Sequence, residues 1–180
     1  METKAKKELI AEGKHLQFVK RGRWEYVERP GVTGIVSIAA VTDDSRIVLV
    51  EQYRPPIDAP SIELPAGLAG DVLGHEDEPL QNAAARELLE ETGYEAAEWR
   101  HLFDGTASAG ISNEVLTFFL ATSLTKVGPG GGDASEDIIV HEVSLDEVAD
   151  WLNRKREEGC VSDLKIHAVL PYCPAGAKQR

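Results

Sequence analysis

The segment from Pro79 to Gly93 constrains the fold more than any other part of the 180-residue chain. Leu80, Ala84 and Leu88 recur at a spacing of four residues, which places them on one face of a helix. Proline suits the first position of a helix, and glycine is a frequent C-terminal cap. The pattern therefore predicts a helix that packs one apolar face against a core.

The last turns of this helix carry three carboxylates, an arrangement that stability alone does not favour. Glu87 and Glu91 lie four residues apart with Glu90 beside them, so like charges share one face and repel one another. The helix dipole also disfavours anions at this end, and Arg86 can neutralise only one of the three. A solvated acidic surface would account for the charges without a function. A divalent cation held by carboxylate oxygens would instead remove the repulsion, so the pattern indicates a metal site.

Apolar and β-branched runs predict a sheet around this helix. Residues 32–41 are nearly all apolar, as in a fully buried strand. Further strands are predicted at residues 46–53, 61–64, 114–122 and 137–143. Glycine-containing runs predict a loop at 68–77 and a mobile loop at 127–135.

Two more helices follow the last of these strands. Ser144 to Glu147 has the form of a capping box, which predicts a helix from there to about Gly159. A short final helix is expected over residues 162–170. Because strands and helices are mixed along the chain, the sequence predicts an α/β fold with a mixed sheet packed between helices.

The N-terminal residues predict a separate antiparallel extension. Leu16 to Arg29 is rich in aromatic and β-branched residues around a turn at Gly22, which indicates a β-hairpin. Such a hairpin is too short to be stable alone. We therefore expect residues 1–31 to form an extension, with the main domain at 32–180.

Charge and cysteine content restrict the partners and the compartment. The formal net charge of −12 repels nucleic acid, and an anionic substrate would need bound cations to approach. Two isolated cysteines without metal-ligand spacing suggest a reducing compartment. The chain has neither an apolar signal segment near Met1 nor a membrane-spanning apolar run. We expect a cytoplasmic enzyme that binds neither nucleic acid nor membrane.

The helix and its flanks resemble a known family. Nudix hydrolases share the box G-x5-E-x7-R-E-U-x-E-E-x-G-U, in which U is a bulky apolar residue. From Glu78 onward the match is complete, and the helical part reads Arg86-Glu87-Leu88-Leu89-Glu90-Glu91-Thr92-Gly93-Tyr94. Ten residues separate Gly67 from Glu78 where the pattern has five, which indicates a five-residue insertion. The resemblance implies a Nudix fold: a mixed sheet sandwiched between helices, here with an N-terminal antiparallel β extension.

Other segments resemble the branch of ADP-ribose pyrophosphatases and nucleoside diphosphate sugar hydrolases. These segments are Trp24-Glu25-Tyr26-Val27-Glu28-Arg29, Val50-Glu51-Gln52-Tyr53-Arg54-Pro55-Pro56 and Ile62-Glu63-Leu64-Pro65-Ala66-Gly67. Ala109 stands where that branch has a proline associated with ADP-ribose preference. The branch implies hydrolysis of the pyrophosphate bond of ADP-ribose or a hexose nucleotide to a nucleoside monophosphate and a sugar phosphate. A Nudix hydrolase of a dinucleotide or triphosphate, or a non-catalytic nucleotide-binding regulator, are the alternatives.

The resemblance also implies roles for single residues. Glu87, Glu90, Glu91 and the backbone carbonyl of Ala66 would bind two or three Mg²⁺ ions, with Mn²⁺ as a substitute. The expected catalytic residues are Glu90, Arg86, which would orient a glutamate, and Glu136, which would accept a proton from the attacking water. Asp137 is the alternative base.

Substrate contacts are expected from four residues and from a second copy of the chain. Arg54 precedes two prolines and could bind phosphate in a bidentate manner, although a surface salt bridge is the alternative. Trp24 could stack on the base or simply pack within the hairpin. Arg29 and Glu63 complete the set. Branch members are commonly homodimers that exchange the N-terminal β segment, and we expect the same arrangement here.

Overall fold

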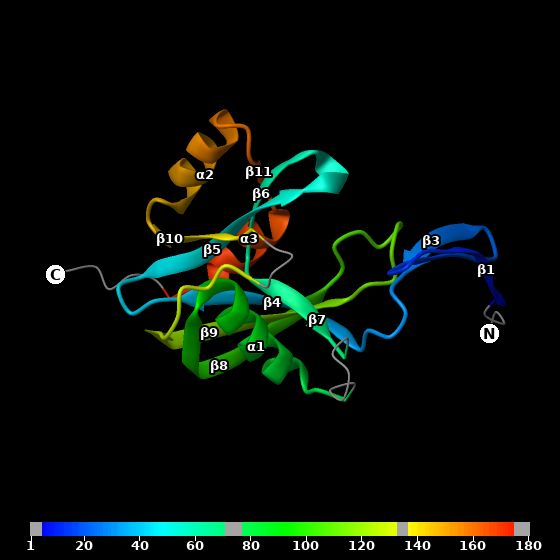
Figure 1. The fold of residues 1–180 in the computed structure, drawn as a ribbon, viewed down its shortest axis with the longest axis horizontal. Helices are drawn as coiled ribbons and strands as arrows, with labels where there is room; N and C mark the ends of the chain where they lie inside the picture. Colours follow the sequence, from blue (N-terminus) through cyan, green and yellow to red (C-terminus); the bar gives the residue numbers. More distant parts are fainter. Residues whose placement is uncertain (1–4, 71–76, 133–136, 175–180) are drawn as a thin grey trace.

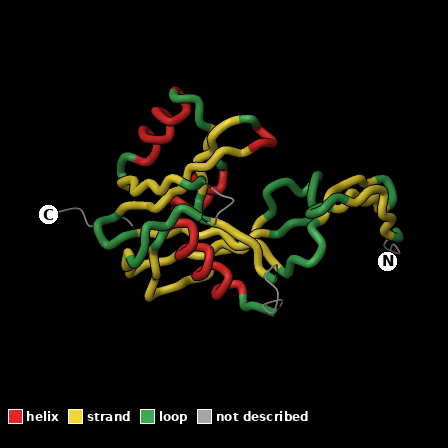
Figure 2. Tube along the Cα trace, in the orientation of Figure 1, coloured by secondary structure: helices red, strands yellow, loops and turns green. Residues whose placement is uncertain are grey.

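A computed structural model describes residues 5–70, 77–132 and 137–174, which form two separate sheets (Figures 1 and 2). The larger sheet has eight strands. Six of them are hydrogen-bonded in the order β11-β6-β5-β4-β9-β8, while β10 pairs with β5 and β7 pairs with β4. Its strands are β4 (Gly34–Val41), β5 (Arg46–Arg54), β6 (Ala59–Glu63), β7 (Ala66–Ala69), β8 (Tyr94–Gly105), β9 (Leu116–Lys126), β10 (Ile139–Ser144) and β11 (Val161–Ser162).

Helices cover both faces of the larger sheet, as the mixed pattern predicts (Figure 1). They are α1 (Leu80–Thr92), α2 (Val148–Glu157) and α3 (Leu164–Val169), with 3-10 turns η1 (Pro55–Ile57) and η2 (Leu170–Tyr172). α1 packs Ala84 and Leu88 on one face of the sheet, and α2 and α3 pack against the other. Most strand pairs are antiparallel, but β4 pairs with β9 in parallel, so the sheet is mixed.

The smaller sheet is N-terminal and projects from one side of the molecule (Figure 1). It contains β1 (Lys7–Glu12), β2 (Gln17–Arg21) and β3 (Trp24–Glu28), all antiparallel. The predicted hairpin is present as β2 and β3, whereas β1 was not predicted because every residue in it is exposed and no burial alternation marks it. The backbone N–H of Val27 donates to the carbonyl of Ile111, which ties this sheet to the segment before β9 (2.8 Å).

Local expectations differ from the structure in several places, including β8, for which the sequence predicts no strand. β7 lies partly within the predicted loop 68–77 because it pairs with β4, while residues 71–76 lie outside the described residues. The predicted capping box is wrong: Glu147 donates its N–H to the carbonyl of Ser144 in a turn, and the helix begins at Val148 without a side-chain cap. Residues 127–132, the described part of the predicted loop 127–135, are hydrogen-bonded to the end of α1.

The predicted boundaries of α1 hold to within one residue. Pro79 is the N-cap rather than the first helical residue, and Gly93 is the C-cap in the left-handed conformation (φ 72°), which glycine adopts without steric cost. Within the described ranges, no helix is long and apolar enough to cross a membrane.

Candidate active site

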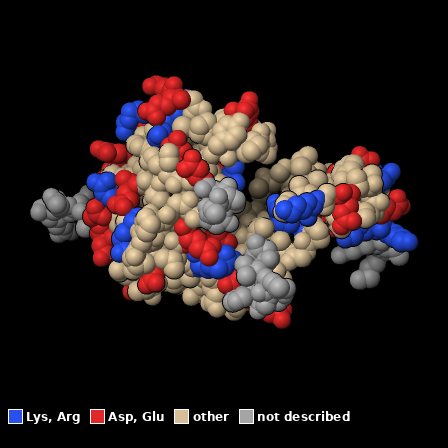
Figure 3. Space-filling view, viewed as in Figure 1, with Lys and Arg blue, Asp and Glu red and all other residues tan. Residues whose placement is uncertain are grey.

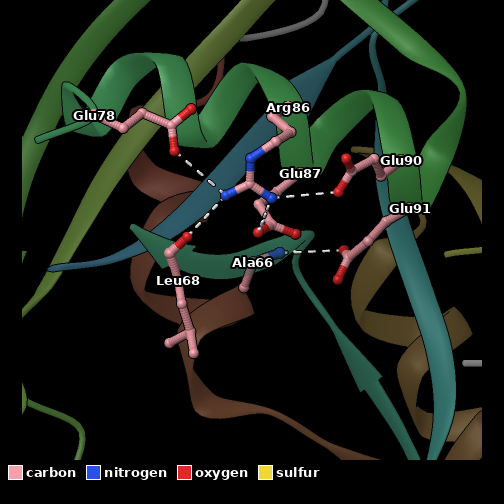
Figure 4. Close-up of polar contacts among 7 residues, drawn as sticks. All are labelled: Ala66, Leu68, Glu78, Arg86, Glu87, Glu90 and Glu91. Carbon is pink, nitrogen blue, oxygen red and sulfur yellow. Dashed lines mark hydrogen bonds and ion pairs between the residues drawn. The ribbon is translucent and has the colours of Figure 1, made fainter. Parts of the chain in front are cut away.

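The carboxylates at the end of α1 face the beginning of β7 (Figure 4). Burial of Leu88 against the sheet directs Glu87 and Glu91 toward this strand rather than into solvent. Glu91 is only 4% exposed, and its Oε2 accepts a hydrogen bond from the backbone N–H of Ala66 (3.2 Å). The apolar face of the helix thus positions the acidic face at the turn between β6 and β7.

Arg86 connects these acids to one another and to β7 (Figure 4). Its Nη1 donates to Glu87 Oε1 at 2.7 Å and to Glu90 Oε2 at 3.3 Å, while Nη2 donates to the carbonyl of Leu68 at 2.9 Å and lies 3.4 Å from Glu78 Oε2. Burial lowers the pKa of Arg86, but the charges of the surrounding glutamates outweigh burial and raise it. The guanidinium therefore stays charged, and it has the contacts expected of a residue that orients glutamates.

Gly67 leaves the space that the Glu87 side chain occupies. A Cβ atom built on Gly67 would lie 1.9 Å from Cδ and 2.1 Å from Oε1 of Glu87, distances that atoms cannot adopt. Gly67 is not in the left-handed region, so its backbone conformation does not require glycine. The absence of a side chain at this position is needed for the carboxylate, not for the turn.

The donor set fits a hard divalent cation. Three carboxylates and the carbonyl of Ala66 offer only oxygen, which Mg²⁺ and Mn²⁺ prefer. Among the described residues, no three His, Cys, Asp or Glu side chains lie close enough together to enclose an ion, and the Arg86 guanidinium bridges Glu87 and Glu90. Because Gly67 has no side chain, the Glu87 carboxylate lies against β7, the strand whose Ala66 N–H donates to Glu91. The residues present are therefore compatible with a divalent-cation site.

Arg54 and Glu63 form a bidentate pair next to this region. Arg54 Nε and Nη2 donate to the two carboxylate oxygens of Glu63, each at 2.7 Å. The Glu63 side chain is 8% exposed and that of Arg54 is 44% exposed. The pair fixes the guanidinium at the end of β5 while leaving part of it open to solvent, and Glu63 lies three residues before Ala66 in the chain.

Trp24 and Arg29 lie apart from α1, where the N-terminal sheet meets residues 109–115. Trp24 is 55% exposed and lines a cavity of about 280 Å³ with Ala109 and Gly110, while Arg29 lines a neighbouring cavity of about 250 Å³ and pairs with Glu114 at 3.3 Å. Figure 3 shows acidic and basic side chains side by side over α1, with the N-terminal sheet standing off the main body. The structure thus places the predicted residues in three groups: the α1 cluster, the Arg54–Glu63 pair and the Trp24–Arg29 region.

Three further glutamate and aspartate residues bear on the site. Glu136 is outside the described residues, and Asp137 is exposed. Glu78, for which the sequence suggested no role, has a side chain only 8% exposed and contacts Arg86. Its place eight residues before Arg86 in the box was the signal that could have identified this contact.

Comparison with curated proteins identifies relatives across most of the chain. A family model described as NUDIX domain matches residues 33–164. The methanol dehydrogenase activator of Bacillus methanolicus is 35% identical over 82% of this chain and 74% of that protein. An ADP-ribose pyrophosphatase of Bacillus subtilis is 34% identical over 92% of this chain and 83% of that protein. A GDP-mannose pyrophosphatase of Escherichia coli O1:K1 is 31% identical over 70% of this chain and 65% of that protein.

A solved structure supports the fold. The crystal structure of an ADP compounds hydrolase superposes with a TM-score of 0.68 over 84% of this chain and 82% of that chain. Its sequence is 20% identical, so the likeness concerns the fold alone. The fold of this chain is therefore shared with that solved structure.

Proposed function

The chain belongs to the Nudix hydrolase family, and from that premise we propose that it hydrolyses the pyrophosphate bond of a nucleoside diphosphate sugar. The products would be a nucleoside monophosphate and a sugar phosphate. The observation that carries the proposal is the placement of three glutamates in the C-terminal half of α1, where Arg86 contacts Glu87 and Glu90 and the backbone N–H of Ala66 contacts Glu91. ADP-ribose and hexose nucleotides such as GDP-mannose are the candidate substrates, in keeping with the names of two relatives.

The proposed metal ligands are Glu87, Glu90, Glu91 and the carbonyl oxygen of Ala66. When bound, two or three Mg²⁺ ions, or Mn²⁺ in their place, would polarise the phosphates and lower the pKa of an attacking water. Arg86 orients two of these carboxylates, and the Ala66 N–H orients the third. The protein thereby supplies fixed oxygen ligands before any substrate arrives.

Arg54 is proposed to bind the substrate phosphates. The whole-chain charge of −12 opposes the approach of a pyrophosphate, so a fixed cation at the site has a clear electrostatic role. Its bidentate pair with Glu63 holds the guanidinium plane in place, and the Arg54 side chain is 44% exposed at the end of β5. Glu63 would then act in substrate binding by positioning Arg54.

Trp24 and Arg29 are proposed to contact the nucleoside part. The exposed indole of Trp24, at a cavity of about 280 Å³, offers a flat face on which a base can stack. Arg29 lies at the adjoining cavity, where Glu114 fixes its guanidinium. Glu136 is proposed as the base that takes the proton of the attacking water, with Asp137 as the alternative.

The N-terminal sheet supports a proposal of homodimerisation with exchange of this segment, residues 1–31. Val19 is its only fully buried side chain among residues 5–31, whereas Leu9, Ile10 and Trp24 are each about half exposed. A three-stranded sheet with so little core gains stability by covering its apolar side chains. We propose that a second copy of the chain covers them, which sedimentation of the full chain against a chain lacking residues 1–31 would test.

The state of the two cysteines is relevant to the cellular compartment in which the protein acts. Cys160 and Cys173 are both free thiols, and burial raises the pKa of Cys173 to about 11, so this thiol stays protonated at neutral pH. We propose a reducing compartment, the cytoplasm, which cell fractionation would check.

A substrate panel with Mg²⁺ tests the function directly. ADP-ribose, GDP-mannose, UDP-glucose, ADP-glucose, a dinucleotide and a nucleoside triphosphate would be compared by kcat/KM with product identification. The proposal predicts the highest value for one of the diphosphate sugars. A higher value for the dinucleotide or triphosphate would move the enzyme to another substrate class, and no turnover with any compound would refute catalysis.

A further inference from the structure

The C-terminal end of α1 is covered by a single backbone segment. An α-helix leaves its last four carbonyl groups without partners inside the helix. Here the last helical bond runs from the N–H of Gly93 to the carbonyl of Leu89 (2.8 Å), so the next four carbonyls must find partners elsewhere. These carbonyls belong to the turn that carries two of the proposed metal ligands.

All four find partners in residues 126–132, which we call the capping segment. The carbonyls of Glu90, Glu91, Thr92 and Gly93 accept hydrogen bonds from the N–H of Gly132 (3.1 Å), the N–H of Gly131 (2.8 Å), Nζ of Lys126 (2.9 Å) and the N–H of Val127 (2.9 Å), respectively. Positive and partially positive donors therefore face the negative end of the helix dipole. The helix end is held against fraying by contacts distant in sequence.

Gly130 permits this close approach. A Cβ on Gly130 would lie 2.4 Å from the carbonyl carbon of Thr92 and 2.7 Å from the carbonyl oxygen of Glu91, both of which are backbone atoms that cannot rotate away. Its φ of +70° also favours glycine. Any side chain at this position would push the capping segment off the helix end.

We propose that Gly130 is a positioning residue for the carboxylates of Glu90 and Glu91. Two of the capping hydrogen bonds end on the backbones of these same two residues, and fixing a backbone fixes the direction in which its side chain leaves. Their mutual repulsion and the helix dipole both favour unwinding of this turn when no cation is bound. The capping segment opposes that unwinding and keeps the ligands preorganised. The inference rests on the proposed function, since it takes these glutamates as cation ligands.

Direct binding of Mn²⁺, measured by electron paramagnetic resonance on the purified full chain without substrate, tests the proposal. Gly130→Ala should weaken Mn²⁺ binding about tenfold, the range seen when groups that orient metal ligands are removed. It should also speed amide hydrogen exchange in a peptide covering residues 86–93 of the metal-free protein. Gly159→Ala is the matched control, because Gly159 is also left-handed (φ +97°) but a Cβ there meets nothing within 4 Å.

Pro129→Gly provides a second variant that adds no atoms near the helix. It loosens the capping segment by removing a backbone restraint, and Mn²⁺ binding should weaken about twofold to fivefold. Gly130→Ala and Pro129→Gly proteins that both bind Mn²⁺ within twofold of the wild type would overturn the proposal, even if both melt at lower temperature. Should Gly130→Ala not fold, Pro129→Gly decides alone. A wild-type chain that binds no Mn²⁺ would instead refute the metal assignment made under the proposed function.

Discussion

Replacement of Gly67 by alanine separates the requirements of the site from those of the fold. The backbone of Gly67 is acceptable for alanine, but the added Cβ would lie 1.9 Å from Cδ of Glu87. Contacts of a real Cβ under 3.0 Å are essentially never seen, so the carboxylate must retreat by roughly 1 Å or more. The retreat also breaks its 2.7 Å hydrogen bond with Arg86.

The expected effect on turnover is large. A displacement of about 1 Å at a catalytic group can cost on the order of a hundredfold in rate, which corresponds to about 2.7 kcal/mol of transition-state stabilisation. Stability should change little, because removal of a glycine from the unfolded chain contributes about 0.4–1 kcal/mol in favour of the folded state and offsets part of the local strain. We therefore expect Gly67→Ala to lose activity while the free energy of unfolding stays within about 1 kcal/mol of wild type.

The assay compares kcat and urea unfolding for Gly67→Ala and for Gly105→Ala. Gly105 also has a backbone that alanine accepts, but the nearest atoms to a Cβ there are 3.9 Å away, an ordinary contact. Gly105→Ala should keep wild-type activity. Glu87→Asp shortens the side chain that the alanine would displace. The double variant Gly67→Ala/Glu87→Asp should therefore lose less kcat than the product of the losses in the two single variants.

Wild-type turnover in Gly67→Ala would refute this reasoning, since it would mean that the position of Glu87 does not matter for catalysis. Strictly multiplicative losses in the double variant would also count against a direct clash. A loss of activity accompanied by unfolding would place the effect in the fold rather than in the site.

Three further predictions concern charge. Glu91→Gln should reduce kcat by on the order of a hundredfold, because it deletes a proposed metal ligand. The melting temperature of the metal-free protein should not fall, because one repelling charge is removed and the Ala66 N–H keeps a hydrogen-bond acceptor. Near-normal turnover would exclude Glu91 as a ligand. Arg86→Met should cost about 2–4 kcal/mol of unfolding free energy in chelator, because partly buried acids lose their counter-charge; an unchanged urea midpoint would contradict it. Burial favours a raised pKa for Glu51, but hydrogen bonds from Lys155 and His141 outweigh it and hold the pKa below 4.5. That stabilisation is present above pH 4.5 and is lost as pH falls through the folded-state pKa. The unfolding free energies of wild type and Glu51→Gln should therefore converge in acid. A difference between the two free energies that stays constant from pH 7 to pH 3 would contradict this prediction.

The elements that could be predicted from sequence are those specified by local pattern. α1 has an apolar stripe, a proline before it and a glycine after it, and each of these signals acts within a few residues. β4 is recognisable because all its residues from Val36 to Val41 are buried, which requires a continuous apolar run.

The elements that were missed have no clear local pattern of their own. Within the described part of the chain, β8 is an edge strand paired with β9, and an irregular register between His101 and Phe103 disrupts the alternation that would reveal it. β7 is a strand only because β4 lies beside it.

The candidate site likewise contains contacts that could be predicted from local sequence and contacts that could not. The glutamates of α1 could be predicted because helical spacing places them on one face. The pairing of Arg54 with Glu63 could not, since it depends on the register in which β5 meets β6, with Val50 opposite Glu63. The contact of Gly67 with Glu87 likewise joins two segments that only the folded sheet brings together.

The parallel pairing of β4 with β9 has a consequence for how the chain reaches this structure. Ile35 lies opposite Leu116 and Ala40 lies opposite Ala121. One edge of β4 is therefore hydrogen-bonded to residues that lie about eighty positions later in the chain. A growing polypeptide therefore leaves the ribosome with that edge open until β9 emerges, and pairings between such distant segments form slowly. We therefore expect aggregation to compete with folding in the interval between synthesis of β4 and synthesis of β9.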